Sequence, residues 1–133
     1  MRKAVIPGFI LLITVLGGCH TAAVAVRPDD NHIAYAIDST LKQCDQNLLG
    51  CDGGKKLTVQ PVAAAFINGG ANLAFLGKDG RVYRCNASGE SCQEMPLNFS
   101  DAAAISGGPN ASVIVIYQSG HLDICSGGSC QKH

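Results

Sequence analysis

Six of the seven cysteines lie in three close pairs, and this spacing constrains the fold more than any other feature of the chain. The pairs recur about every 40 residues, a period that indicates an internal repeat. They are Cys44 with Cys51, Cys85 with Cys92, and Cys125 with Cys130. The residues between the paired cysteines include Asn, Asp, Ser and Gly, which favour tight turns. We therefore predict three local disulfides, each of which would contribute about 2 to 2.5 kcal/mol by closing a short loop.

A structural zinc site is the alternative use of these cysteines. The paired cysteines of this chain are separated by six or four residues, and these spacings do not resemble the paired CxxC knuckles of zinc sites. We therefore expect no metal ion.

Aligning the chain on the first cysteine of each pair gives three repeats, which span residues 22–61, 62–101 and 102–133. Each repeat contains three short apolar runs separated by turn residues, and such runs predict strands. The predicted strands are Ala22–Val26, Ile33–Ile37 and Leu41–Cys44; Val62–Ile67, Leu73–Leu76 and Arg81–Cys85; and Ala102–Ile105, Val113–Tyr117 and His121–Cys125. A fourth strand is expected at 56–60 and at 94–98. Only Gln131–His133 follows the last cysteine, so the third repeat is expected to lack its outer strand.

The predicted class is all-β. The middle runs Ile33–Ile37 and Val113–Tyr117 are apolar on both of their alternating faces, which is typical of strands that are covered on both sides. The alanine runs Ala63–Ala65 and Ala102–Ala104 could instead begin short helices. Glycine pairs stop both runs within a few residues, so strands are preferred.

The N-terminal residues have the order of a targeting segment. Arg2 and Lys3 precede an apolar stretch, Val5–Leu16, that is shorter than the roughly 20 residues of a membrane-spanning helix. The stretch ends in Leu16-Gly17-Gly18-Cys19, which resembles the lipobox of bacterial lipoproteins. A soluble secreted protein with a chance cysteine near its cleavage site is the alternative.

The lipobox resemblance implies cleavage and a lipid anchor. A signal peptide of residues 1–18 would be cut between Gly18 and Cys19, and Cys19 would carry covalent diacylglycerol and an acyl chain at the start of a lipidated terminus, residues 19–21. Two or three such chains anchor a protein stably to membrane lipid. His20, rather than aspartate, follows the cysteine, so the resemblance implies the outer membrane, on its periplasmic side or at the cell surface. No other cofactor is expected.

The segments Asp30–Tyr35 and Leu73–Tyr83 resemble the strand-turn-strand core of RCC1-type β-propeller repeats. The Trp-Gly that usually follows the third strand in that family is replaced here by the paired cysteines. The resemblance implies a rigid binding surface and no particular activity. A β-trefoil or another threefold β fold is the alternative, and the missing last strand counts against a trefoil.

Three repeats predict an open half-propeller, because propellers close with at least four blades. Apolar faces are then expected at both ends, formed by residues 22–37 and 113–117. Such faces require either self-association or a protein partner.

Composition and motifs narrow the function to binding. Outside Arg2 and Lys3 there are eight basic and ten acidic residues, so no basic surface for nucleic acid is expected. No GxSxG, HExxH or phosphate-binding glycine pattern is present, and we expect no catalytic residues and no enzyme activity. We expect a structural or protein-interaction lipoprotein of the cell envelope, such as an accessory of a secretion or conjugation assembly. The alternative is a glycan or small-ligand binding module.

Overall fold

The computed structural model describes residues 20–45, 47 and 50–133, and within them it is built almost wholly of β-strands. The strands form three four-stranded antiparallel sheets, one from each predicted repeat. The all-β prediction is confirmed. No strand of one sheet pairs with a strand of another within the described residues, so these sheets do not join into a closed barrel.

Each sheet is formed by strands that are consecutive in the sequence. The first sheet contains β1 (Ala22–Val26), β2 (Ile33–Ile37), β3 (Thr40–Cys44) and β4 (Lys55–Lys56). The second contains β5 (Pro61–Ile67), β6 (Asn72–Gly77), β7 (Val82–Asn86) and β8 (Gln93–Glu94). The third contains β9 (Ala102–Gly107), β10 (Val113–Tyr117), β11 (Leu122–Ser126) and β12 (Ser129–Lys132). Two single 3-10 turns, η1 (Asn68–Gly70) and η2 (Pro109–Ala111), link the first two strands of the second and third sheets.

The outer strands differ from the prediction. The third sheet does have a fourth strand, β12, so the prediction that the last repeat lacks one is wrong. Its two cysteines are only five positions apart, and a tight turn with Gly127 at a φ of 58° returns the chain directly along β11. The presence of β12 also removes the argument that was made against a β-trefoil.

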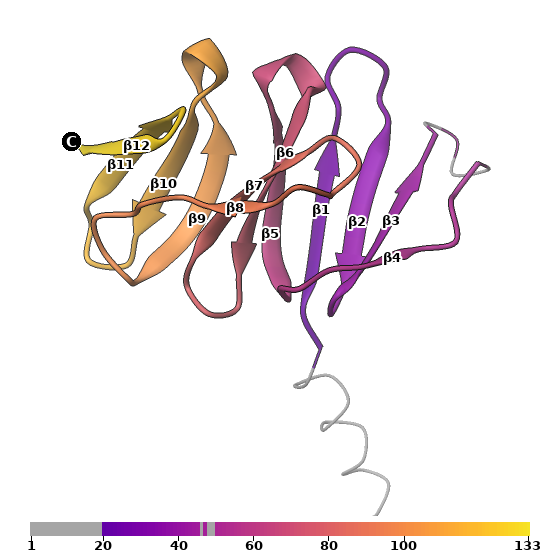
Figure 1. Cartoon of the computed structure of the whole chain (residues 1–133), viewed down its shortest axis with the longest axis horizontal. Coiled ribbons are helices and arrows are strands. Elements are labelled where there is room, and N and C mark those ends of the chain that lie inside the picture. Colours follow the sequence, from indigo (N-terminus) through magenta and orange to yellow (C-terminus); the bar gives the residue numbers. More distant parts are fainter. Residues whose placement is uncertain (1–19, 46, 48–49) are drawn as a thin grey trace, which may run out of the picture.

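The outer strands β4 and β8 are only two residues long, against the longer strands predicted at 56–60 and 94–98. The residues that follow them leave the sheet edge and cross toward the next sheet, as Figure 1 shows. Leu57 and Val59 on the first crossing and Met95 on the second have buried side chains. Burial between sheets replaces strand pairing in these segments.

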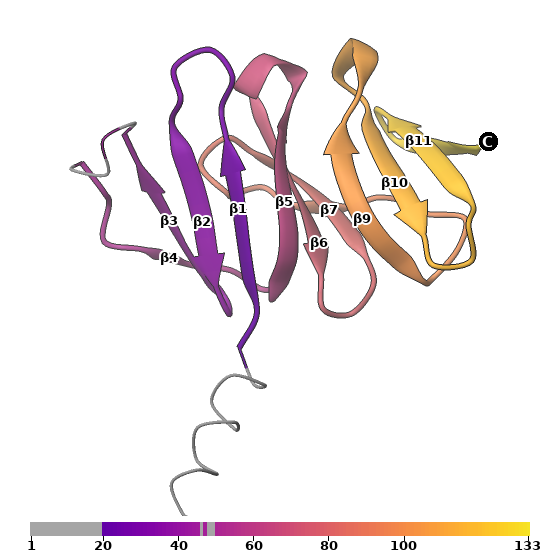
Figure 2. The ribbon, with the colours of Figure 1, turned by 180° about the vertical axis from the view of Figure 1, so that it is seen from behind.

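The alanine runs are strands, as preferred from the sequence. Ala63–Ala65 lies within β5, and Ala102–Ala104 lies within β9. In the structure β1 lies beside β5, and β5 lies beside β9, so the three initial strands are neighbours (Figures 1 and 2). Small side chains at these positions allow the three sheets to approach one another closely.

The sheets pack face against face in a row, with the second sheet in the middle. We call the face turned toward the preceding sheet the upstream face and the opposite one the downstream face; in the first sheet, the upstream face is the one turned away from the second sheet. Upstream positions in the middle strands are Ile33, Tyr35 and Ile37 in β2, Leu73 and Phe75 in β6, and Val113, Val115 and Tyr117 in β10. Downstream positions are Ala34 and Ala36, Ala74 and Leu76, and Ile114 and Ile116.

Two apolar cores hold the row together. In the first, Ala34, Ala36 and Leu41 of the first sheet pack with Leu73 and Phe75 of the second. In the second, residues on the downstream face of the second sheet pack with upstream residues of the third, namely Ala74, Leu76 and Val82 with Val113, Val115 and Tyr117. Of the three described sheets, only the middle one is therefore covered on both faces.

The prediction that Ile33–Ile37 and Val113–Tyr117 are covered on both faces is wrong. The alternating burial of β2 and β10 shows that each strand is covered on one face only. Both strands belong to sheets at the ends of the row, where no further described sheet covers the second face. No helix of the described residues is long and apolar enough to cross a membrane.

Candidate interaction surfaces

The predicted lipidation and cleavage residues, Cys19 and Gly18, lie outside the described residues. The first described residue, His20, places its Nδ1 atom 2.8 Å from Oδ2 of Asp38, in the turn between β2 and β3. The backbone N–H of Thr21 donates a hydrogen bond to the other carboxylate oxygen of Asp38. These contacts, together with β1 from Ala22 onward, tie the chain to the first sheet immediately after position 19.

The structure joins the cysteines in the three local pairs expected from the sequence. Cys44, Cys85 and Cys125 occupy equivalent places near the end of the third strand of each sheet, and all three are buried. The loop closed by Cys85 and Cys92 rests on the first sheet. There the side-chain amide of Gln43 donates a hydrogen bond of 2.8 Å to the carbonyl of Ala87. Each disulfide thus fixes the outer part of its own sheet.

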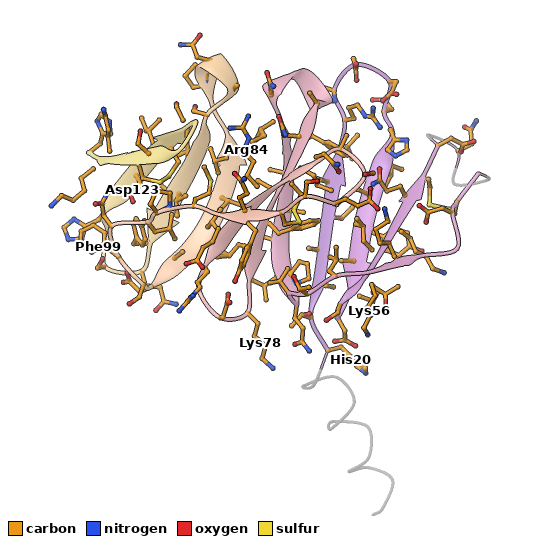
Figure 3. The ribbon with its side chains drawn as sticks, in the orientation of Figure 1. His20, Lys56, Lys78, Arg84, Phe99 and Asp123 are labelled. Atoms are coloured by element: carbon orange, nitrogen blue, oxygen red, sulfur yellow. A yellow bond between two sulfur atoms is a disulfide. The ribbon has the colours of Figure 1, made fainter. Side chains whose placement is uncertain are left out.

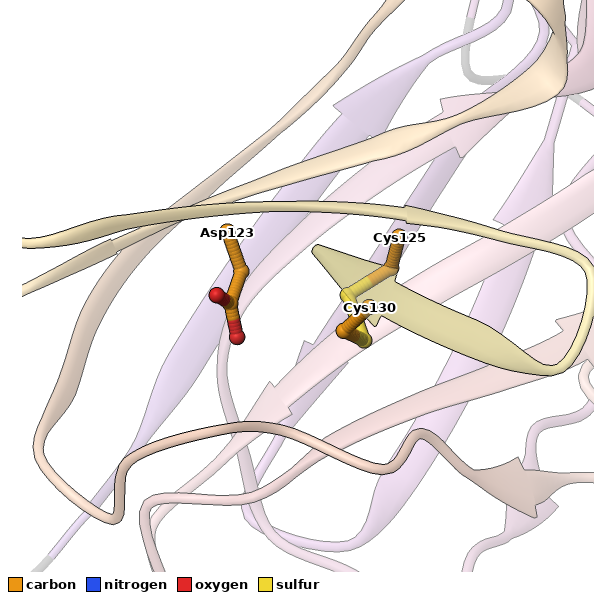
Figure 4. A group of neighbouring side chains, drawn as sticks. All are labelled: Asp123, Cys125 and Cys130. Carbon is orange, nitrogen blue, oxygen red and sulfur yellow. A yellow bond between two sulfur atoms is a disulfide. The ribbon is translucent and has the colours of Figure 1, made fainter. Parts of the chain in front are cut away.

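One group of side chains, Asp123, Cys125 and Cys130, has the close spacing of a metal site. Figure 4 shows that the two sulfur atoms are bonded to each other, so neither is a thiolate that could bind a metal. The carboxylate of Asp123 is already occupied by hydrogen bonds. The cluster is therefore structural.

Asp123 is fully buried in the second core and was not singled out from the sequence. The hydroxyl of Tyr117 donates a short hydrogen bond to Oδ2, and Asn98 donates one from its backbone N–H at 3.0 Å and one from its side-chain amide at 2.9 Å. Asn98 lies on the crossing from the second sheet to the third. The aspartate therefore fastens that crossing to β11.

These contacts shift both ionisable groups. Burial by itself would raise the pKa of Asp123, but the hydrogen bonds from Tyr117 and Asn98 outweigh it and hold the pKa below its usual value. Burial and the neighbouring carboxylate raise the pKa of Tyr117 far above that of a free tyrosine. Asp123 is thus a stable anion and Tyr117 a stable neutral donor, so neither is poised to transfer a proton near pH 7.

His20, His32 and His121 have structural partners. His20 contacts Asp38, and His32 places Nε2 2.7 Å from the side-chain oxygen of Gln43. His121 stacks on Phe99, with ring centroids 4.4 Å apart. None of these three contacts joins a histidine to a serine or cysteine side chain.

Two hollows on the surface differ in their chemistry. One lies over β1, β2 and the start of β5, and Tyr35 is its one polar side chain among alanine, valine and isoleucine residues. Another contains Phe99, whose ring is stacked by His121 and approached by Lys132 at 5.8 Å. Figure 3 shows Phe99 and Asp123 at the same end of the row. The first hollow is thus almost wholly apolar, whereas the second combines the stacked rings with polar side chains such as Asn98 and Asp101.

An apolar surface covers the upstream face of the first sheet. Val24, Val26 and Ile37 expose 62%, 53% and 49% of their surface, and Ile33 and Tyr35 beside them are half-buried. Strand pairing sets Val24 opposite Tyr35 and Val26 opposite Ile33, so these side chains share one face. This is the end face predicted from residues 22–37.

A second apolar surface covers the downstream face of the third sheet. Ile116 is 39% exposed, and Ile114, Leu122 and Ile124 are half-buried. Ile114 pairs with Ile124, and Ile116 pairs with Leu122, so the four side chains share one face. The prediction placed this surface on Val113–Tyr117. The structure assigns only the alternate residues of that strand to it and buries Val113, Val115 and Tyr117.

Comparison with known proteins gives a fold likeness and no family. No family model matches the chain, and no curated protein matches it. Among solved structures, PorZ, described as an essential bacterial surface component of the type-IX secretion system of Porphyromonas gingivalis, is similar with a TM-score of 0.60 and 14% sequence identity over 86% of this chain. The N-terminal domain of Nup159 is similar with a TM-score of 0.53 and 12% identity over 83% of this chain. This chain spans 15% of the PorZ chain and 29% of the Nup159 chain, so the likeness concerns the arrangement of the sheets.

Proposed function

We propose that this chain is a lipid-anchored protein-interaction module of a bacterial cell envelope. Its three sheets act as half of a β-propeller, and Cys19 anchors them to the outer membrane. The observation that carries the proposal is the exposed apolar surface of β1 and β2, where Val24 and Val26 are more than half exposed. Contiguous apolar surface of this kind marks interaction sites, because it is costly to leave in water.

The setting of the proposal comes from two likenesses. The leader resembles that of bacterial lipoproteins, and the sheets resemble part of PorZ, which is described as a surface component of a secretion system. A role as an accessory of a secretion or conjugation assembly fits both. A binding role also agrees with the state of Asp123 and Tyr117, which are fixed by their hydrogen bonds.

Anchoring through Cys19 would orient the module. His20 is held by Asp38, and β1 begins at the same end of the molecule as the β2–β3, β6–β7 and β10–β11 turns (Figure 1). Lys56, Lys78 and His20 lie toward this end in Figure 3. This end would face the bilayer, and the uncovered apolar faces would stand roughly upright on the membrane, open to a neighbour beside them.

Anchoring is tested by Cys19→Ser in the full chain. We expect the variant to remain uncleaved and to lose labelling by radioactive palmitate, because a hydroxyl cannot form the thioether. His20→Asp is expected to shift the protein toward the inner membrane on fractionation. Equal palmitate labelling of Cys19→Ser and parent would show that the anchor is elsewhere.

The interaction role is tested in cells with a photo-crosslinking amino acid in the full-length chain. At Val24 it should give a discrete protein adduct, whereas at Lys78, which is exposed on the turn after β6, it should give little. Absence of any adduct at Val24, with normal expression, would contradict the interaction role.

A further inference from the structure

The three sheets are equivalent residue by residue, when aligned on the first cysteine of each disulfide. In the first sheet Ala34 pairs with Gln43, in the second Ala74 pairs with Arg84, and in the third Ile114 pairs with Ile124. Each of these pairs includes the residue just before Cys44, Cys85 or Cys125. Equivalent positions can therefore be compared directly across the sheets.

Upstream positions are buried in the second and third sheets and exposed in the first. Leu73 and Phe75 are 0% exposed in the second sheet, and Val113 and Val115 are 0% exposed in the third. Their equivalents Ile33 and Tyr35 are half-buried, and Ile37 beside them is exposed. The first sheet thus carries the side chains of a covered face without the cover.

Downstream positions show the opposite pattern along the row. Ala36 and Leu41 in the first sheet and Leu76 and Val82 in the second are almost wholly buried. Their equivalents in the third sheet are Ile116, which is exposed, and Leu122, which is half-buried. The third sheet likewise carries the side chains of a covered face.

The two uncovered faces are of opposite kind. Each junction within the chain joins a downstream face to an upstream face. The chain leaves one upstream face free at one end of the row and one downstream face free at the other. The surface that would continue the row at each end is therefore present on another copy of the same chain.

We infer that two copies of this chain associate head to tail, with the downstream face of the third sheet of each copy packed on the upstream face of the first sheet of the other. The inference rests on the proposed interaction role and names its partner as a second copy. Two identical junctions related by a twofold axis would close six sheets into one ring. Closed symmetry of this kind leaves no apolar end face, unlike a head-to-tail chain that continues as a filament.

A stable pair needs a large area of contact. A specific protein interface buries about 1,200 to 2,000 Å² in total. The proposed dimer has two separate junctions, each formed by whole four-stranded sheets, and the apolar centres contain Val24, Tyr35 and Ile37 on one side and Ile114 and Ile116 on the other. Closure also makes the second junction intramolecular, which strengthens the pair without further contacts.

The inference is tested with two charged variants of the full-length chain in detergent micelles. Ile116→Glu and Ile37→Lys each place a charge at an exposed position, so each monomer is expected to fold, as circular dichroism can verify. Each homodimer would contain two damaged junctions. We therefore expect the dissociation constant of each variant alone, measured by analytical ultracentrifugation, to rise at least about 30-fold, because interface hot spots have effects of this order. Lys78→Glu is the matched control and should dimerise like the parent.

Mixing the two variants provides the sharper result. In a head-to-tail pair of unlike variants, one junction is that of the parent and the other sets Glu at position 116 on the face that carries Lys at position 37. The mixture should therefore restore dimers, predominantly mixed ones, which differential tagging detects. A face-to-face pair of third sheets predicts instead that Ile37→Lys alone dimerises normally, and that result would overturn the inference.

The location of cross-links separates this inference from the wider interaction role. A photo-crosslinker at Ile116 should join the third sheet of one copy to the β1–β2 segment of a second copy, as mass spectrometry of the adduct can show. An adduct of Ile116 or Val24 with a different protein would overturn the second-copy inference and leave the interaction role intact. A monomeric parent protein with no adduct at either position would overturn both.

Discussion

The two junctions between sheets use different chemistry at equivalent places, although the sheets share one plan. In the second sheet, Gly77 ends β6 and Tyr83 fills the space beside it, with its hydroxyl 2.8 Å from Oδ2 of the exposed Asp79. A side chain at Gly77 would collide with Val59 and Asp79. In the third sheet, the equivalent of Gly77 is Tyr117, and the equivalent of Tyr83 is Asp123.

The tyrosine therefore comes from the third strand of the sheet at the first junction and from the second strand at the second junction. Only the second junction buries the carboxylate. The first junction is stabilised chiefly by apolar packing, around Phe75 and Leu41. The second adds a buried ionic hydrogen-bond network around Asp123. A repeated backbone thus tolerates exchanges of side chains, provided that volume and hydrogen bonding are conserved at each junction.

The largest effect is expected from Phe75→Ala in the first junction. Phe75 is 0% exposed, so truncation leaves a cavity between two sheets and should lower the free energy of unfolding by about 3 to 5 kcal/mol. Chemical denaturation measures the change. Tyr35→Ala, at the equivalent position on the uncovered face, is the matched control and should cost about 1 kcal/mol or less in the monomer. A cost for Tyr35→Ala that grows with protein concentration would show that a second copy covers this face.

Asp123→Asn should have the next largest effect. The amide oxygen can take the place of Oδ2 and accept the bond from Tyr117, but the NH₂ group then faces the side-chain NH₂ of Asn98. One buried donor without a partner costs about 1 to 3 kcal/mol. Asp79→Asn removes the matching charge beside Tyr83 at an exposed site and should change stability much less. Equal effects of the two substitutions would mean that burial does not distinguish the two junctions.

A smaller change in the free energy of unfolding is expected when pH is varied. The folded-state pKa of Asp123 is lowered, so its ionisation stabilises the fold fully above the unfolded value of about 4, and this stabilisation is lost as pH falls through the folded-state pKa. The pKa of Tyr117 is raised, so its contribution is present below about pH 10 and is lost as pH rises above that value. The difference in stability between the parent and Asp123→Asn should be constant near neutral pH and should shrink below about pH 4. A difference that is independent of pH down to pH 2 would exclude this role for the carboxylate.

The repeat pattern made much of this architecture predictable. Alternating apolar runs ahead of Cys44, Cys85 and Cys125 identified three strands in each sheet, because period-two patterns and turn residues are local signals. The strand β12 was missed because its pairing depends on a tight turn inside the last disulfide. The role of Asp123 was missed for a different reason, since it depends on Asn98, which lies 25 positions away in the sequence.

The surfaces could be predicted only in part. An open row of sheets implied apolar end faces at residues 22–37 and 113–117. Which alternate residues face outward depends on which neighbour each sheet packs against. The neighbours are set by the packing of Phe75 on the first sheet and of Val115 on the second, and no local sequence pattern predicts these contacts.

The smallest effect is expected from a pair of glycine substitutions that compare the Cys85–Cys92 loop with the Cys125–Cys130 loop. Gly89 and Gly127 both have positive φ, at 85° and 58°, so alanine costs about 1 kcal/mol at either position. At Gly89 the added carbon would also lie 2.4 Å from Cδ2 of Leu41, which is only 1% exposed and cannot move freely, whereas nothing lies within 4 Å at Gly127. Gly89→Ala should therefore be the more destabilising by about 1 kcal/mol, the lower end of the cost of overpacking a core. Equal losses of stability would show that the Cys85–Cys92 loop can lift from the first sheet, and the first junction would then depend on its apolar core alone.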